Sequence, residues 1–217
     1  MLLLPRDKLV LATGNPHKVR ELRELLRPWH VPLGSLADFA GIGPADEHGA
    51  TLAENARCKA LGYARSLGEW VLADDTGLEV DALGGAPGVR SARFAGDGAT
   101  MADNRARLLD ELAGVPGPDR TARFVCRLAI ADPAGAVVAE AAGACRGRIR
   151  FGATGEFGFG YDSLFEIVEY RRTLAELGPA ATAVIGHRGR GVRSLLTAMM
   201  RGETSGFVKN RLDTVEK

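Results

Sequence analysis

The sequence predicts an α/β fold, and three observations indicate this class. Short apolar runs typical of buried strands alternate with segments whose apolar residues recur at helical spacing. Residues 121–149 alternate in the manner of a long antiparallel hairpin. The chain is 217 residues long and 46% hydrophobic, which is enough to bury a substantial core. We expect one domain over residues 1–202 and a polar tail over 203–217.

The expected elements follow one another along the chain. An apolar run predicts the first strand over residues 8–13, and the next segment is helical because Val19, Leu22 and Leu26 share one face. Thr51 and Glu54 have the spacing of a capping box, which places the start of a second helix. The remaining elements are a buried strand over 69–75, a helix over 100–114 capped by Thr100, a hairpin over 121–149 that turns at 132–135, a glycine-rich loop over 151–162 and a last helix over 187–200.

Charge and cysteine content argue against several classes of protein. The 28 lysines and arginines nearly balance 27 aspartates and glutamates, so no global field attracts nucleic acid or a membrane surface, and we expect neither as a partner. No stretch approaches the roughly 20 apolar residues of a membrane span. The three cysteines lie far apart and form no Cys-x-x-Cys pair, which argues against a zinc site or a disulfide framework and favours a reducing cytoplasm.

The first candidate site follows the first strand directly. Thr13, Gly14 and Asn15 connect this strand to the N-terminus of a helix that carries Lys18. Backbone N–H groups and the helix dipole favour an anion at such a position, and Lys18 adds a positive charge. An ordinary strand-to-helix turn is the alternative, since neither glycine-rich phosphate-loop motif is present.

The second candidate site is the run from Asp74 to Gly77, Asp-Asp-Thr-Gly, expected at the end of the strand over 69–75. Carboxylates at the end of an apolar strand are costly unless they are hydrogen-bonded, paired or bound to a cation. Side chains alternate along a strand, so we expect only Asp75 to face the site unless the backbone turns. Two alternatives are an Asx turn closed by Gly77 and an aspartic protease triplet, but the second needs another Asp-Thr-Gly that the chain lacks. Acidic residues from the preceding segments would complete the oxygen ligands that Mg²⁺ prefers: Asp46, Glu47 or Glu54.

Two further segments carry groups suited to a nucleobase. His187 and Arg188 open the last helix, where a neutral histidine can donate or accept and the arginine offers a fixed fork of donors to a carbonyl. Residues 159–162, Phe-Gly-Tyr-Asp, supply aromatic rings for stacking beside a carboxylate. The alternatives are a surface or capping role for the first pair and packing at the edge of the core for the second.

These segments together resemble the inosine triphosphate pyrophosphatase family, also called the Ham1 family. Five motifs carry the resemblance in chain order over almost all of residues 8–200: LATGNPHKVREL, TLAENARCKA, LADDTGLEVDALGGAPGVRSARFAG, GFGYD and HRG. The resemblance implies a mixed α/β sheet, two lobes with the active-site cleft between them, and a homodimer. It also implies the Mg²⁺-dependent hydrolysis of ITP, dITP and XTP to the monophosphate and pyrophosphate, which removes deaminated purines from the nucleotide pool.

The family's roles are carried over to the matching residues of this sequence. The resemblance implies that Asp75 is the proton acceptor and that Glu47, Asp74 and Asp75 hold the metal. Lys18 and Lys59 are expected to bind phosphates. Residues 159–162 are expected to line the nucleoside pocket, and His187 and Arg188 to read the base. The implied substrate contacts are Thr13, Gly14, Asn15, Pro16, His17, Lys18, Lys59, Thr76, Phe159, Gly160, Tyr161, Asp162, His187 and Arg188.

Two positions depart from the family pattern. The family usually has a lysine five residues before the histidine, where this chain has Thr182. It usually has a serine directly before the histidine, where this chain has Gly186. Arg190 and Arg193 are the candidates to replace the missing positive charge.

Two rival functions remain open at this stage. The first is a Maf-like pyrophosphatase that acts on modified pyrimidine nucleotides through a similar phosphate site. The second is a non-catalytic nucleotide-binding module, which would need no acidic cluster, so Glu47, Asp74 and Asp75 count against it. A panel of purine and pyrimidine triphosphates separates these functions.

Overall fold

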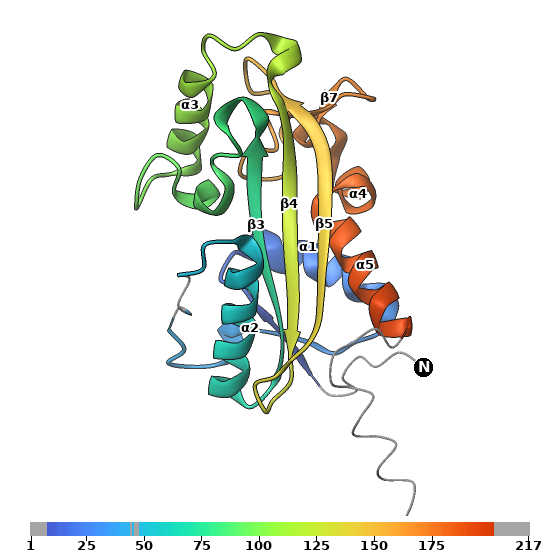
Figure 1. Cartoon of the computed structure of the whole chain (residues 1–217). Coiled ribbons are helices and arrows are strands. Elements are labelled where there is room, and N and C mark those ends of the chain that lie inside the picture. Colours follow the sequence, from blue (N-terminus) through green and yellow to red (C-terminus); the bar gives the residue numbers. More distant parts are fainter. Residues whose placement is uncertain (1–7, 44, 46–47, 202–217) are drawn as a thin grey trace, which may run out of the picture. The chain divides into compact units, whose positions relative to one another are not determined.

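A computed structural model of the chain describes residues 8–43, 45 and 48–201. Within this part, seven strands form a single sheet in the order β2-β1-β3-β4-β5-β6-β7 (Figure 1). The strands are β1 (Leu9–Ala12), β2 (Leu33–Ser35), β3 (Trp70–Val80), β4 (Thr121–Ala131), β5 (Val137–Ile149), β6 (Phe165–Ile167) and β7 (Arg172–Thr173). The α-helices are α1 (Pro16–Leu26), α2 (Leu52–Leu67), α3 (Met101–Glu111), α4 (Leu174–Ile185) and α5 (His187–Arg201).

The sheet is mixed, as the resemblance implied. Strand β1 pairs in parallel with both β2 and β3, whereas β6 pairs antiparallel with both β5 and β7. The predicted hairpin is confirmed, because β4 and β5 are neighbours and the Gly135 N–H donates to the Asp132 carbonyl in the turn. The helices with predicted caps are also confirmed: Thr51 caps α2 and Thr100 caps α3, each in a capping box.

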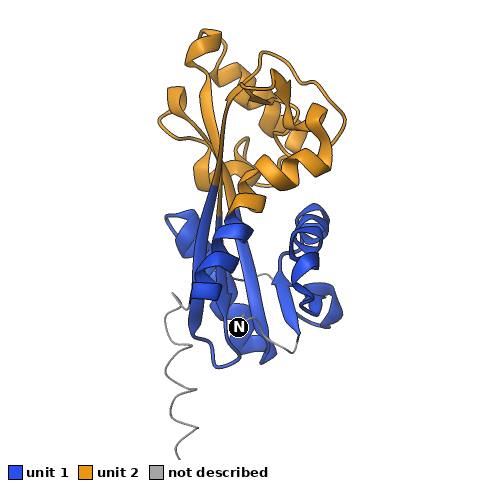
Figure 2. Cartoon of the chain, turned by 90° about the vertical axis from the view of Figure 1, so that its right-hand side faces the viewer, with its two compact units in different colours: residues 1–75, 127–143, 191–217 blue, residues 76–126, 144–190 orange. Residues whose placement is uncertain are grey.

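The chain forms two compact units, which Figure 2 shows in different colours. Unit 1 contains residues 1–75, 127–143 and 191–217, and unit 2 contains residues 76–126 and 144–190. The chain passes between units within β3, β4 and β5 as well as within α5. Asp75 is therefore the last residue of its segment of unit 1, and Thr76 is the first of unit 2.

Helix α2 is packed closely against the strands of unit 1. Its buried face carries Ala56, Ala60 and Ala64, which share a core cluster with Val10 of β1 and Val71 of β3. Alanine side chains are short, so the helix backbone lies near the sheet and its longer side chains can reach along the strand. Helix α1 lies on the opposite face of these strands (Figure 1).

Unit 2 has a separate core of its own, in which aromatic and large aliphatic side chains predominate. Phe124 of β4 and Phe165 of β6 lie with ring centroids 4.7 Å apart, and Leu78 of β3 is fully buried in the same cluster. Helix α3 is tied to the segment before it by the buried Asn104, whose amide donates to the Ala92 carbonyl and accepts from the Ala95 N–H. These bonds fix α3 within unit 2.

The strand expected over 69–75 differs from the observed one. β3 does not end at the two carboxylates but continues through them to Val80. The prediction ended the strand at Asp74 and Asp75 because two charged residues interrupt the run of apolar residues. In the structure both carboxylates are buried beside lysines, which offset the cost of burying their charges, so the strand can continue. Strand β2, the two short strands β6 and β7, and helix α4 were not predicted. The expected tail over 203–217 lies outside the described residues.

Candidate functional site

Asp74 and Asp75 project to opposite faces of β3, and a different helix supplies a lysine to each. Lys18 of α1 approaches Asp74 at 3.5 Å, and Lys59 of α2 approaches Asp75 at 2.7 Å. Both carboxylates are buried, with exposures of 1% and 7%. The strand alternation used for prediction is thus confirmed, and the backbone does not turn to bring both carboxylates to one face. Each buried charge is balanced by its own ammonium group.

The turn before α1 lies beside Asp74 because of the strand register. Ala12 of β1 pairs with Ala73 of β3, so Thr13 follows at the level of Asp74. Asn15 is the N-cap, and its Oδ1 accepts hydrogen bonds from the backbone N–H groups of His17 and Lys18. Sequence reasoning assigned an anion to these N–H groups, but the cap already engages two of them. The Lys18 ammonium remains the charged donor at this turn.

Helix α2 anchors the polar segment that precedes it. The Asn55 side chain accepts from the Gly49 N–H at 2.8 Å, and the Tyr63 hydroxyl accepts from the Ala45 N–H at 2.9 Å. Asn55, Lys59 and Tyr63 are spaced four residues apart and therefore lie on one face of the helix. The same face thus bonds to Ala45, Gly49 and the Asp75 carboxylate.

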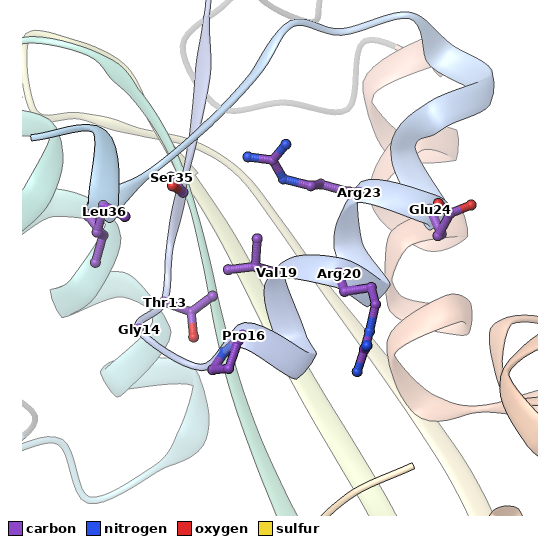
Figure 3. A pocket seen from close by; sticks show the side chains of 10 residues that line it. Thr13, Gly14, Pro16, Val19, Arg20, Arg23, Glu24, Ser35 and Leu36 are labelled. Carbon is purple, nitrogen blue, oxygen red and sulfur yellow. The ribbon is translucent and has the colours of Figure 1, made fainter. Parts of the chain in front are cut away.

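A pocket with a volume of about 410 Å³ lies beside the turn in unit 1. Figure 3 shows Thr13, Gly14 and Pro16 on its wall, with side chains from α1 and from the segment after β2 around it. Arg20 also lines it and donates to His17 Nδ1 at 2.9 Å, so the His17 side chain is engaged on the exposed surface of α1. Arg23 and Glu24 of the same helix line the pocket as well, so two positive groups and one negative group surround it.

In unit 2, Arg188 is the central group of the predicted base-reading set. Its side chain is 1% exposed, and Nη2 donates to the Thr76 hydroxyl at 3.1 Å. The guanidinium carbon lies 5.9 Å from the centroid of the Phe159 ring. The structure therefore brings together Thr76, Phe159 and Arg188, which are far apart in the sequence.

His187 lies against an aromatic ring that the sequence reasoning missed. It is 5% exposed, and its imidazole stacks on Phe124 with centroids 4.8 Å apart and an angle of 21° between the planes. Phe124 is one of several apolar residues in the predicted hairpin. The only signal in the sequence that could have identified it is its place among the inward-facing residues of the strand. The stack fixes the imidazole plane at the start of α5.

Tyr161 and Asp162 of the glycine-rich loop are buried and bond to the protein itself. The Tyr161 hydroxyl donates to the Ser91 carbonyl at 2.9 Å, and Asp162 accepts from the Phe159 N–H at 2.9 Å. Burial raises the pKa of the Tyr161 hydroxyl well above its usual range, so this group stays protonated. These contacts hold the loop that carries Phe159.

The two departures from the family pattern lie at the junction of α4 and α5. The Thr182 hydroxyl donates to the Gly178 carbonyl at 3.0 Å, and the Gly186 N–H donates to the Thr182 carbonyl at 2.8 Å. A Cβ atom at Gly186 would overlap that same carbonyl oxygen, so a serine requires the backbone to shift. Arg190 is exposed and its Nε donates to the Ile185 carbonyl, which caps α4.

The expected metal ligands are only partly within the described residues. Glu47 lies outside them, so its place is not described. Among residues 8–43, 45 and 48–201, no group of three or more His, Cys, Asp or Glu side chains is arranged to hold a metal ion. Asp74 and Asp75 each provide carboxylate oxygen atoms, on opposite faces of β3.

Comparisons with known proteins show which proteins this chain resembles. A model of the Ham1 family matches residues 9–198. The chain is 50% identical over 194 residues to a dITP/XTP pyrophosphatase of Desulforamulus reducens, covering 89% of this chain and 96% of that one. A dITP/XTP pyrophosphatase of Thermus thermophilus is 48% identical over 195 residues, 90% of this chain and 93% of that one. The solved structure of a HAM1 protein from Coxiella burnetii superimposes with a TM-score of 0.80 at 36% identity, covering 90% of this chain and 99% of that one.

Proposed function

Because the chain belongs to the Ham1 family, we propose that it hydrolyses the non-canonical purine nucleotides ITP, dITP and XTP to the monophosphate and pyrophosphate. One observation carries the proposal: a buried carboxylate that can accept a proton, Asp75, lies 2.7 Å from a cation that can bind phosphate, Lys59. Relatives named dITP/XTP pyrophosphatase, 48–50% identical to this chain, support the substrate class.

The proposed reaction breaks the bond between the α and β phosphates. A water molecule attacks the α phosphorus, its proton passes to Asp75, and pyrophosphate leaves. Lys18 and Lys59 bind the triphosphate and neutralise its charge, which lowers the repulsion that the attacking oxygen meets. Lys59 also keeps the Asp75 carboxylate in place before the substrate binds, since the pair is buried.

We propose that Mg²⁺ is the cofactor. When bound, Mg²⁺ would supply further charge neutralisation on the phosphates. Asp74, Asp75 and Glu47 are the residues expected from the family to hold it. Because Asp74 projects to the other face of β3, the fit rests on the buried Asp75 carboxylate, whose oxygen atoms match the preference of this cation.

Base recognition is proposed for the unit 2 residues. Hypoxanthine and xanthine carry a carbonyl where adenine carries an amino group, so the Arg188 guanidinium can donate to the former but meets another donor in the latter. Thr76 orients this guanidinium, and Phe159 offers a ring for stacking. Asp75 of the unit 1 cluster and Thr76 of the unit 2 cluster are neighbours in the sequence.

The decisive experiment measures pyrophosphate release from ITP, dITP, XTP, ATP, dUTP and dTTP, each with Mg²⁺ and with EDTA. We expect rapid release from the first three substrates only, and only with the metal present. Preferential cleavage of the pyrimidine nucleotides would instead support the Maf-like alternative. Tight binding of ITP without cleavage would identify a binding module.

We also propose a cytoplasmic location and a homodimer. The three cysteines, which all lie within the described residues, form no disulfide bond with one another, as suits a reducing compartment. Among the described residues, no helix is both long and apolar enough to span a membrane. Light scattering on the purified full-length chain measures the oligomeric state.

A further inference from the structure

The loop around Phe159 has a fixed shape that its own residues define. The Phe159 N–H donates to the Asp162 carboxylate at 2.9 Å, and the Asp162 N–H donates to the Phe159 carbonyl at 3.2 Å. Gly158 and Gly160 have φ angles of 78° and 64°, a region that favours glycine. A Cβ atom at Gly158 would overlap the Asp162 carboxylate, so the loop folds tightly over this side chain.

Helix α3 holds this loop from outside through one side chain. Arg105 Nη1 donates to the Gly160 carbonyl at 2.8 Å, and the residue is half-buried. The helix beneath it is rigidly attached, because Asn104 is fully buried and bonds to the Ala92 carbonyl and the Ala95 N–H. Arg105 thus connects a fixed helix to the residue next to Phe159.

The position of the Phe159 ring matters because Arg188 lies opposite it. The Arg188 guanidinium is held by Thr76 and its carbon lies 5.9 Å from the ring centroid. A base that stacks on the ring and bonds to the guanidinium needs both groups at a fixed separation, since binding groups lose effect when misplaced by about 1 Å. A loop free to move would leave the guanidinium in place but not the ring.

We propose that Arg105 is a positioning residue for base recognition. By donating to the Gly160 carbonyl it fixes the loop that carries Phe159 and so sets the distance between the Phe159 ring and Arg188. The inference rests on the proposed function, because it assigns to Arg105 a part in the selectivity of that same site. Arg105 itself is not expected to contact the substrate.

The test compares Arg105→Met and Arg105→Lys with a matched control, Arg107→Met. Arg107 lies on the same helix and donates to a backbone carbonyl in the same way, but to Phe94 rather than to the loop. The ratio of kcat/KM for ITP to that for ATP is measured for each variant, together with hydrogen exchange at the Phe159 and Asp162 amides. Thermal unfolding checks that each variant is folded.

We expect Arg105→Met to lower the ITP to ATP ratio about tenfold, the order of one hydrogen bond from a charged group. Exchange at the two loop amides should accelerate, Arg105→Lys should restore part of the ratio, and Arg107→Met should keep it. An unchanged ratio in folded Arg105→Met would overturn the inference. If Arg105→Met does not fold, the test rests on Arg105→Lys. Faster hydrogen exchange at the loop amides of Arg105→Lys together with an unchanged ITP to ATP ratio would reject the proposal.

Failure of the proposed function gives a different result. In that case the unaltered protein does not prefer ITP to ATP, so the ITP to ATP ratio of kcat/KM shows no preference that a variant could lower. The role in base recognition then falls as well, while hydrogen exchange still reports whether Arg105 fixes the loop. A normal preference in the unaltered protein together with an unchanged ratio in Arg105→Met rejects only the present inference.

Discussion

The two units carry clusters of different chemistry. The unit 1 cluster consists of two ion pairs, Lys18–Asp74 and Lys59–Asp75, in which full charges meet on either face of one strand. The unit 2 cluster consists of one buried guanidinium, Arg188, with a hydroxyl and an aromatic ring around it. Charge attracts any triphosphate regardless of its base, whereas directed donors distinguish a carbonyl from an amino group. Changes in unit 1 should therefore affect all substrates alike, and changes in unit 2 should affect selectivity.

The largest effect is expected for Asp75→Asn, which removes the proposed proton acceptor. Loss of a positioned base typically lowers turnover by about 10²- to 10⁴-fold, and binding of ITP should largely persist because the lysines remain. Pyrophosphate release at saturating Mg²⁺ measures the loss. Glu79→Gln is the control, since Glu79 lies on the same strand in a partly exposed pair with Arg123. Near-native turnover in folded Asp75→Asn would falsify the assignment of the base.

The next largest effect is expected for Arg188→Ala, which should remove the preference for ITP over ATP. A site whose buried donors are left unpaired by the wrong ligand can favour the right ligand by a factor of roughly 10⁴ in kcat/KM. We expect Arg188→Ala to lower the ITP to ATP ratio of kcat/KM by a factor of at least about 10². Competition kinetics with both nucleotides give the ratio directly. Arg172→Ala, at an exposed arginine of the same unit, is the control. Full selectivity in the alanine variant would move base reading to another group.

A smaller and uniform effect is expected for Lys59→Met. We expect kcat/KM to fall by about 10- to 100-fold for ITP, XTP and dITP alike, as for the loss of a charged hydrogen bond. Stability should also fall by about 3–5 kcal/mol, because the buried Asp75 loses its partner. Denaturant titration measures the loss of stability separately from the loss of kcat/KM. Lys8→Met is the control, since Lys8 pairs with Asp38 on the surface. A loss confined to one base would contradict the contrast between the units.

The smallest effect is expected for Thr182→Lys, which restores the charge that the family usually has. We expect kcat/KM for ITP to rise by about 2- to 5-fold, since a single solvent-facing charge contributes about 0.2–1 kcal/mol. The Mg²⁺ requirement should not change. Val184→Lys places the same charge at an exposed position of α4 and serves as the control. An equal gain in both variants would show that only the overall charge of the helix matters.

Local sequence determined much of this protein. Helix caps at Thr51 and Thr100, the hairpin turn at residues 132–135, and the α/β class follow from short-range spacing, because each depends on bonds between residues close in the chain. The alternation along β3 also predicted that Asp74 and Asp75 face opposite ways. Their roles, by contrast, came from the resemblance carried by five motifs.

Tertiary structure alone decided which distant groups meet. No spacing pairs Lys18 with Asp74, or Lys59 with Asp75, since each pair forms only when a helix packs on its own face of β3. The continuation of β3 to Val80 has the same cause: those lysines offset the burial of charges that appeared, in sequence, to end the strand. Long-range contacts of this kind depend on how helices and strands pack. The periodicity of one helix or strand does not indicate which other elements pack against it.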